Sequence, residues 1–228
     1  MTDDKNNRKT SIHIGLIPDG NRRYAAKKNR PVWQGHWAGV RKIDQFLDWC
    51  LEYPEIKRIS IFALSTENLN RDKREVEELW KIYKAYLQKS LDNPRIAQHG
   101  VQVRILGNDG VWKPDIQDLV KEVIDSTKHY SKHILNILLA YGSKFEIDNA
   151  VKKIVDKPLR TLDRFLLVRE PLDIVIRTGN QYRLSNFMLY QASYAEIYFS
   201  KTLWPEFTKR EFERIMEWYF EQVKKWGK

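Results

Sequence analysis

The stretch IHIGLIPDGNRRY, residues 12–24, places a strand pattern directly before a polar turn. Ile12 to Ile17 is an apolar run of strand length, and the sequence PDGN that follows it breaks regular structure. Gly20 permits a tight turn or a close approach of another backbone. We therefore predict a strand that delivers Asp19 to its end, and a turn that leads into a helix.

Short apolar runs and one-sided helical stripes alternate along the rest of the chain. Further strands are expected at Ile59–Leu64, Val101–Leu106, Ile134–Ala140, Asp173–Ile176 and Ala195–Phe199. Helical stripes run through Val40–Leu51, Val76–Leu87, Ile116–Val123, Lys144–Val155 and Phe212–Val223. This alternation indicates crossover units and a mostly parallel sheet that is covered on both faces. The prediction is one α/β domain over residues 11–228, preceded by a mobile tail over residues 1–10.

Composition excludes several classes of protein. The chain has 228 residues, 42% of them hydrophobic and 31% charged, which is typical of a folded globular domain. No apolar run approaches the roughly 20 residues of a membrane-spanning helix, and the polar first ten residues do not resemble a signal peptide. Cys50 is the single cysteine, which excludes an internal disulfide and a multi-thiolate zinc site. We expect a cytoplasmic protein.

The net charge of +10 favours an anionic partner: nucleic acid, an acidic membrane surface or a phosphorylated small molecule. Ligands of parallel sheets bind outside the carboxyl ends of the strands, where the first turn lies. Arg22 and Arg23 supply planar, permanently charged groups suited to phosphate oxygens, and Asn21 can begin a helix with free N–H groups. An ordinary turn with a capping Asp19 and solvated arginines is the alternative.

A second polar cluster, Ser65-Thr66-Glu67-Asn68, follows the next apolar run and is itself followed by Arg71. Hydroxyl and amide groups beside an arginine could hold a diphosphate or relay a proton. The same residue types also begin helices, so Asn68 could be a simple cap of the next helix.

A third cluster lies in RTGNQYRLSN, residues 177–186. Arg177, Arg183 and Ser185 could form a clamp for an anion, because an unpaired guanidinium at the end of an apolar strand would be costly. Glu196 lies within another apolar stretch and also requires a cation. A structural ion pair between Arg177 and Glu196 is the alternative.

The chain resembles the cis-prenyltransferases, the Z-type isoprenyl diphosphate synthases, over nearly its whole length. The blocks that carry the resemblance stand in the family's order: HIGLIPDGNRRYAAKK, GHWAGV, FALSTENLNR, LNILLAYGSKFEI, IRTGNQYRLSNFMLYQ, YAEIYF and LWPEF. The resemblance implies a homodimer in which each parallel six-stranded sheet is surrounded by helices, with a hydrophobic tunnel. It also implies Mg²⁺-dependent transfer of a prenyl group from an allylic diphosphate to isopentenyl diphosphate, with release of pyrophosphate.

The resemblance assigns roles to individual residues. Asp19 matches the aspartate that holds Mg²⁺ and helps the allylic diphosphate leave, and Asn68 matches a residue that assists proton removal. Glu196 matches a metal-associated glutamate. The remaining matches are to substrate-binding positions: Gly20, Asn21, Arg22, Arg23, Tyr24, His36, Ser65, Thr66, Glu67, Arg71, Arg177, Arg183 and Ser185.

Five positions depart from the family pattern, and they leave the acceptor open. Val32 replaces an arginine, Leu69 a tryptophan and Asp72 a proline, while Asn180-Gln181 replaces the usual pair with an acidic side chain. Irregular coupling of two allylic diphosphates is therefore one alternative, and a non-catalytic homologue is another. Nucleic-acid binding rests on charge and aromatic content alone and is not expected. Peripheral contact with a membrane surface, through the lipid product, is consistent with the resemblance.

Overall fold

The first strand, β1 (Ile12–Ile17), lies inside a sheet of six parallel strands. The structure, a computed structural model, describes residues 11–155 and 161–222, so the tail predicted over residues 1–10 lies outside it. The strand order is β3-β4-β2-β1-β5-β6. The other strands are β2 (Ile56–Ser65), β3 (Val101–Leu106), β4 (His133–Tyr141), β5 (Ile174–Arg177) and β6 (Glu196–Phe199).

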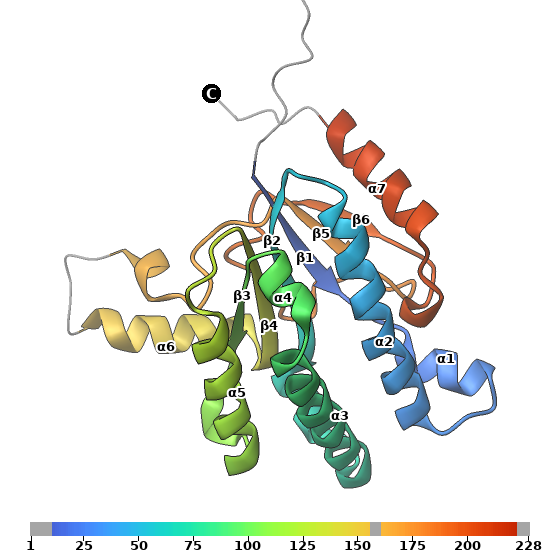
Figure 1. The fold of residues 1–228 in the computed structure, drawn as a ribbon, viewed down its shortest axis with the longest axis horizontal. Coiled ribbons are helices and arrows are strands. Elements are labelled where there is room, and N and C mark those ends of the chain that lie inside the picture. Colours follow the sequence, from blue (N-terminus) through green and yellow to red (C-terminus); the bar gives the residue numbers. More distant parts are fainter. Residues whose placement is uncertain (1–10, 156–160, 223–228) are drawn as a thin grey trace, which may run out of the picture.

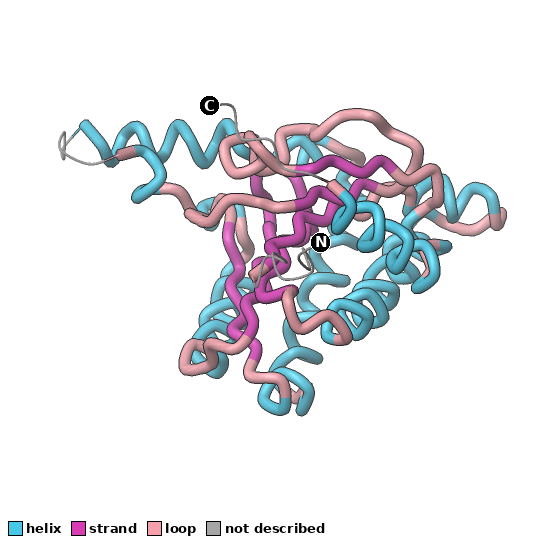
Figure 2. Tube along the Cα trace, turned by 90° about the horizontal axis from the view of Figure 1, so that it is seen from above, coloured by secondary structure: helices cyan, strands magenta, loops and turns pink. Residues whose placement is uncertain are grey.

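Helices and loops cover both faces of this sheet, as Figures 1 and 2 show. The helices are α1 (Asn21–Lys27), α2 (Val32–Leu51), α3 (Lys73–Leu91), α4 (Pro94–Gln98), α5 (Pro114–Thr127), α6 (Ser143–Val155) and α7 (Lys209–Glu221). Side chains of α2 and α7 pack on one face of β1 and β5, and α3 and α5 continue that layer over β3 and β4. The segments 167–172 and 184–192, on either side of β5, cover the opposite face. Every residue of β1 and β5 is buried, as a parallel strand covered on both sides requires.

The sequence predicted the order and type of these elements, with differences at their ends. The predicted bounds of β1 and β3 agree with the structure. Helix α2 begins at Val32, eight residues before the predicted stripe starts at Val40, because Pro31 ends the preceding loop. The short helix α4 was not predicted, since five residues carry no periodic pattern. The predicted last helix ran to Val223, which lies outside the described residues.

A buried polar chain crosses the middle of the sheet. His13 Nδ1 lies 3.0 Å from the Pro171 carbonyl, which can only accept, so Nδ1 carries the proton. His13 Nε2 then accepts from Ser60 Oγ at 2.8 Å, and Ser60 Oγ accepts from Asn136 Nδ2 at 2.9 Å. Burial, with the nearby Arg58, lowers the pKa of His13 to about 4. These contacts hold β1, β2 and β4 in register through a neutral imidazole.

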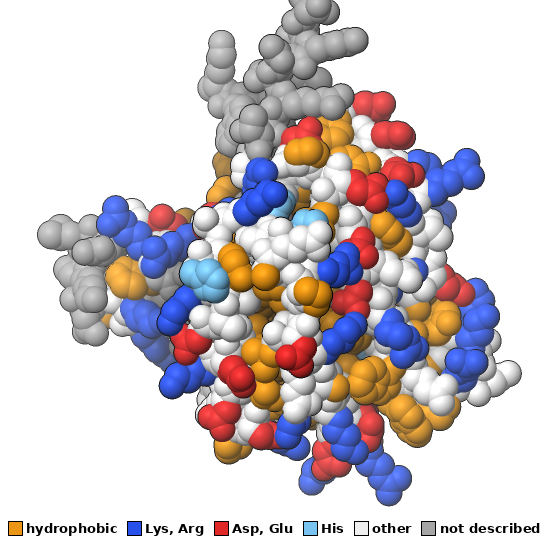
Figure 3. All heavy atoms as spheres, in the orientation of Figure 1, with side chains coloured by type: hydrophobic (Ala, Val, Ile, Leu, Met, Phe, Trp, Pro, Cys, Tyr) orange, Lys and Arg blue, Asp and Glu red, His pale blue; other side chains and the backbone are white. Residues whose placement is uncertain are grey.

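The charge of the chain is distributed rather than concentrated on the face shown in Figure 3. Lysine and arginine side chains there are interspersed with aspartate and glutamate. Within the described residues, no helix has both the length and the apolar character needed to cross a membrane.

Candidate active site

One large cavity opens where β1, β2 and β5 end, and its volume is about 1060 Å³. The polar loops that follow the three strands form its mouth, as predicted from the position of these loops after apolar runs. The predicted site residues that line the cavity are Asp19, Gly20, Asn21, Arg22, Arg23, His36, Ser65, Glu67, Asn68, Arg71, Arg177, Arg183 and Ser185.

Asp19 lies at the centre of the mouth, between two guanidinium groups. Its Oδ2 accepts from Arg177 Nη2 at 2.8 Å, and its Oδ1 accepts from Arg23 Nη2 at 3.2 Å. The two arginines differ in burial, because 4% of the Arg177 side chain is exposed and 44% of the Arg23 side chain. Arg177 also donates to Ser185 Oγ at 2.8 Å and to the carbonyl of Arg183. These contacts hold the Arg177 guanidinium in place beside Asp19 and the loop that carries Arg183 and Ser185.

The alternative in which Arg177 pairs with Glu196 is wrong. The register of β5 and β6 places Glu196 beside Ile174, whereas Arg177 lies beside Phe199. Because a strand advances about 3.3 Å per residue, the two positions are roughly 10 Å apart along the sheet. Glu196 is at the amino end of its strand and does not line the cavity, while the partner of Arg177 is Asp19.

Gly20 and Gly39 allow the first turn to enter the site. Gly20 has φ 119°, a conformation that favours glycine, and it immediately precedes α1. A Cβ atom on Gly39 of α2 would lie 2.3 Å from Asn21 Oδ1, so the glycine gives the Asn21 side chain its space. The block GHWAGV thus brings α2 close enough to α1 to form one wall of the mouth.

The segment after β2 forms a short 3₁₀ helix, Thr66–Asn70. Ser65 Oγ accepts from the Asn68 backbone N–H at 3.2 Å, and Asn68 Oδ1 accepts from the Ser65 N–H at 3.4 Å. Asn68 therefore does not cap α3, as the alternative reading had it; Asp72 does, by accepting from the N–H groups of Arg74 and Glu75. These reciprocal bonds fix Asn68 at the wall of the cavity.

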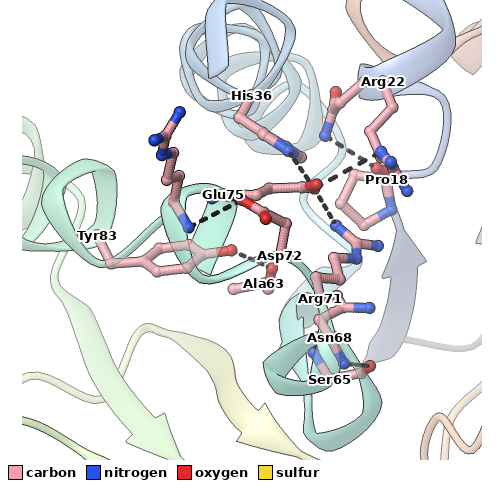
Figure 4. A network of polar contacts seen from close by, with 12 residues as sticks. Pro18, Arg22, His36, Ala63, Ser65, Asn68, Arg71, Asp72, Glu75 and Tyr83 are labelled. Atoms are coloured by element: carbon pink, nitrogen blue, oxygen red, sulfur yellow. Dashed lines mark hydrogen bonds and ion pairs between the residues drawn. The ribbon is translucent and has the colours of Figure 1, made fainter. Parts of the chain in front are cut away.

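Glu75 joins three predicted site residues, although the sequence did not single it out. Figure 4 shows the side chains of Arg22, His36 and Arg71 converging on it from α1, α2 and the end of the 3₁₀ turn. Its Oε1 lies 3.0 Å from Arg71 Nη1, 3.2 Å from His36 Nε2 and 3.6 Å from Arg22 Nε. Burial lowers the pKa of His36, with the Glu75 hydrogen bond acting in the opposite direction. Glu75 therefore positions two cations and an imidazole beside the mouth.

Beyond the mouth, the cavity becomes apolar and runs between α2, α3 and the sheet. Its inner lining consists mainly of aliphatic and aromatic side chains: Val40, Ile43, Ile61, Phe62, Ala63, Leu79, Ile82, Tyr83, Tyr86 and Ile137. The one cavity thus combines a polar mouth rich in arginine with a hydrocarbon-lined interior.

Three predicted site residues do not line this cavity within the chain: Tyr24, Thr66 and Glu196. Thr66 lies directly beside the lining, since its neighbours Ser65 and Glu67 both belong to it. The lining also includes Asn186, which donates to Glu67 Oε1 at 2.8 Å and which the sequence did not nominate. Asn186 ends the motif RTGNQYRLSN, so its position after Ser185 was the signal that could have identified it.

The polar mouth, the apolar interior and the parallel sheet agree with one family of known proteins. A family model described as "Putative undecaprenyl diphosphate synthase" matches residues 17–227. The chain belongs to this family of cis-prenyltransferases. The predicted fold class and enzyme class are both confirmed.

Two relatives show how similar the sequence of this chain is to those of other cis-prenyltransferases. The tritrans,polycis-undecaprenyl-diphosphate synthase (geranylgeranyl-diphosphate specific) of Pyrobaculum aerophilum is 37% identical over 231 residues, which cover 96% of this chain and 97% of that protein. The isoprenyl transferase of Aquifex aeolicus is 34% identical, with 95% of each chain covered.

Two solved structures have the same fold as this cis-prenyltransferase. Lavandulyl diphosphate synthase from Lavandula x intermedia, in complex with dimethylallyl diphosphate, has a TM-score of 0.88 at 26% identity, covering 95% of this chain and 98% of that one. A probable undecaprenyl diphosphate synthase from Campylobacter jejuni has a TM-score of 0.81 at 31% identity, covering 97% and 100%.

Enzymes of this family are in general metal-dependent, and the carboxylates at the mouth limit how a metal could bind. Among residues 11–155 and 161–222, no three His, Cys, Asp or Glu side chains form a group that could hold a metal ion by themselves. Asp19 nevertheless faces the cavity, and its oxygens lie beside arginines that attract phosphate groups. A hard cation held by one carboxylate and by substrate phosphate oxygens fits this donor set.

Proposed function

We propose that this cis-prenyltransferase binds the allylic diphosphate at the Asp19 side of the mouth and isopentenyl diphosphate at the Arg177–Arg183–Ser185 side. The observation that carries the proposal is the single cavity in which Asp19 and five arginines stand before an apolar interior. A diphosphate requires the charged groups of the mouth, and a prenyl chain requires the apolar interior. The paired side chains of Asp19 and Arg177, 2.8 Å apart, would lie between the two bound diphosphates.

Departure of the allylic diphosphate develops negative charge on its oxygens, which donors already in place stabilise in the transition state. Arg22 and Arg23 lie at this side of the mouth, and both side chains are about half exposed, so they can reach a ligand. Mg²⁺, when bound, supplies a further positive charge to the leaving diphosphate. Asp19 is the carboxylate that would hold it, with phosphate oxygens completing the coordination.

Isopentenyl diphosphate would bind against a preassembled clamp. Arg177 is held by Asp19, Ser185 and the Arg183 carbonyl, and its buried Nε has no hydrogen-bond acceptor among the described residues. The exposed Arg183 side chain is available to an incoming anion. Asn68 would assist removal of the proton that leaves isopentenyl diphosphate, because Ser65 fixes its side chain at the cavity wall.

The apolar interior protects the reaction and holds the product. An allylic cation is captured by water unless it forms in a dry, apolar environment. The side chains between α2, α3 and the sheet provide that environment and give the growing chain a path away from the mouth. The predicted hydrophobic tunnel corresponds to this part of the cavity in the proposal.

A broader choice of acceptor is the second candidate, and Gln181 is the observation in its favour. Gln181 lines the cavity at the clamp, where the family pattern has an acidic side chain. Without that negative charge beside the second diphosphate, the site would tolerate another allylic diphosphate as acceptor. A non-catalytic role is disfavoured, because Asp19, Arg177 and Arg183 all remain at the mouth.

We further propose that the protein is a homodimer and contacts a membrane surface through its lipid product. Support for the dimer comes from the family and from the segment between β5 and β6. Tyr182, Leu189, Tyr190 and Tyr194 in that segment each expose 40% or more of their surface. Exposed apolar groups that gather on one segment are typical of an interface. Sedimentation equilibrium should give twice the monomer mass; a monomer at micromolar concentration would contradict the dimer.

The proposed reaction is tested with purified protein, Mg²⁺ and labelled isopentenyl diphosphate. Allylic primers of increasing length should each be supplied separately, and products should be identified by mass spectrometry before and after phosphatase treatment. We expect polyprenyl diphosphates only when an allylic primer and isopentenyl diphosphate are both present, and pyrophosphate in equal amount to the units added. Asp19→Ala is the matched inactive control. Absence of transfer with every primer would refute the proposed function.

A further inference from the structure

Asn186 occupies a strained turn beside the clamp. Its φ is 66°, and Ser185 before it has φ 51°, so two consecutive non-glycine residues lie in the left-handed region. Ser185 is also the residue whose hydroxyl accepts from Arg177. Strained residues persist only where surrounding contacts fix them, and they gather at functional sites. The contacts of Asn186 therefore indicate what this turn holds in place.

The side chain of Asn186 connects two other segments of the mouth. Its Nδ2 donates to Glu67 Oε1 at 2.8 Å, and its Oδ1 accepts from the Lys144 backbone N–H at 2.9 Å. The Asn186 carbonyl accepts from the Ser143 N–H at 2.8 Å. Ser143 and Lys144 begin α6, directly after β4, whereas Glu67 follows β2. One residue thus joins the segments that follow β2, β4 and β5, although β1 lies between β2 and β5 in the sheet.

Gly142 provides the room in which this connection is made. A Cβ atom on Gly142 would lie 2.5 Å from Asn186 Nδ2 and 2.8 Å from Thr66 Oγ1. Both distances are shorter than real Cβ contacts, so a larger residue would displace the side chain of Asn186 or of Thr66. The glycine before α6 therefore gives Asn186 access to the segment that carries Glu67.

Glu67 accepts the hydrogen bond as a carboxylate. Burial acts to raise its pKa, but hydrogen bonds from Asn186, from its own backbone and from the hydroxyls of Ser65 and Thr66 outweigh burial and lower the pKa. A hydrogen bond to an ionised acceptor is stronger than one between neutral groups. Glu67 directly precedes Asn68, which Ser65 fixes at the cavity wall (Figure 4). The bond from Asn186 therefore ends one residue from Asn68.

We propose that Asn186 is a positioning residue that fixes the acceptor clamp relative to Asn68. This inference rests on the proposed function, which assigns both the clamp and Asn68 to isopentenyl diphosphate. The diphosphate and the carbon that loses its proton belong to one small molecule, so the groups that contact them must keep a fixed separation. Asn186 is adjacent to Ser185 of the clamp and bonded to the neighbour of Asn68, and it therefore sets that separation.

The test reverses the direction of the hydrogen bond. Asn186→Asp keeps the shape of the side chain and its acceptor for the Lys144 N–H, but it places a second carboxylate against Glu67, where like charges repel. Combining Asn186→Asp with Glu67→Gln exchanges donor and acceptor, so the double variant regains both the hydrogen bond and the total charge of the wild type.

Steady-state assays should vary isopentenyl diphosphate and the primer separately. For Asn186→Asp we expect a higher KM for isopentenyl diphosphate and a lower kcat, with kcat/KM reduced at least about tenfold, and a change below about twofold in the KM for the primer. The double variant should return to within about threefold of Glu67→Gln alone, which is its reference.

Two further variants control for folding. Asn186→Gly removes the side chain, and because glycine adopts φ 66° without strain, this variant tests the connection if Asn186→Asp does not fold. Ser143→Ala is the matched control, because Ser143 Oγ accepts from the Leu189 N–H at 2.9 Å. Its loss loosens the same segment and leaves the bond between Asn186 and Glu67 intact. We expect Ser143→Ala to lower the melting temperature and to keep both KM values of the wild type.

The outcomes separate this inference from the function on which it rests. If the wild type transfers prenyl groups and the Asn186 variants melt earlier but keep its kinetic constants, the role of Asn186 is structural only, and the inference is overturned while the function stands. A double variant no faster than Asn186→Asp would also overturn it, as would the same change in KM in Ser143→Ala. If the wild type is inactive with every primer, the proposed function fails, and the inference fails with it.

Discussion

Asp19 binds two guanidinium groups of different burial, which allows its structural and chemical roles to be measured apart. The side chain of Arg177 is 4% exposed and that of Arg23 is 44% exposed, at 2.8 and 3.2 Å from the same carboxylate. Two unit charges 4 Å apart near a protein surface attract by about 4 kcal/mol before desolvation is subtracted. A charge-assisted hydrogen bond retains about 1.5–3 kcal/mol, while an exposed ion pair retains about 0.2–1 kcal/mol.

The perturbation is a pair of double-mutant cycles, Asp19→Ala with Arg177→Met and Asp19→Ala with Arg23→Met. Urea unfolding of each variant gives the free energy of unfolding and hence both coupling energies. We expect about 1.5–3 kcal/mol for the buried pair and below about 1 kcal/mol for the exposed pair. Asp19→Ala should remain folded, since domains are stable by about 5–15 kcal/mol, and should still lose prenyl transfer.

Equal coupling energies in the two cycles would refute the argument from burial. Turnover above a few per cent of wild type in Asp19→Ala would refute the assignment of Asp19 to the reaction. The two results are independent, because the first concerns stability without substrate and the second concerns activity of the folded variant.

Three further predictions concern the acceptor site and the core. In steady-state assays that vary each substrate, Arg183→Ala should raise the KM for isopentenyl diphosphate about tenfold and the KM for the primer by less. A larger effect on the KM for the primer would show that the two substrate sites are assigned the wrong way round. The enzyme should slowly condense dimethylallyl diphosphate with itself, and Gln181→Glu should reduce that product in mass spectra; a strict requirement for isopentenyl diphosphate would contradict the second candidate. Folding lowers the pKa of His13 from 6.5 to about 4. As the pH is lowered, the unfolded chain therefore binds a proton at this residue before the folded chain does. The free energy of unfolding should decrease by about 3 kcal/mol between pH 6.5 and pH 4. His13→Gln should flatten this dependence in urea titrations, and an unchanged slope would show that other groups cause it.

The sequence predicted the fold well because the strands are short apolar runs with distinct ends. Val101–Leu106 and Ile12–Ile17 are bounded by polar or glycine-containing turns, and both have the predicted limits in the structure. Chain order and the handedness of crossover connections leave few ways to arrange such units. The position of the polar loops at the carboxyl ends of the strands follows from the same pattern.

The residues that the sequence did not identify are those whose role depends on packing between distant elements. Glu75 lies in the charged run KREVEE, where it has the pattern of a solvated helix position. Only the approach of α1 and α2 to α3 brings Arg22 and His36 to it. Glu196 shows the converse, because its apolar neighbours suggested a buried site residue, while strand register places it away from the mouth. Register is set by tertiary pairing and cannot be read from a single strand.

The position of β1 has a consequence for synthesis of the chain. β1 pairs with β5 as well as with β2, and Asp19 and Arg177 are 158 residues apart in sequence. A ribosome adding about 5–20 residues per second needs roughly 8–30 s to travel that distance. Throughout that interval the nascent chain exposes one edge of its central apolar strand, which is a surface prone to aggregation. The arginine that completes the catalytic mouth is thus added together with the strand that ends this exposure, so the enzyme cannot become active before β1 is paired on both sides.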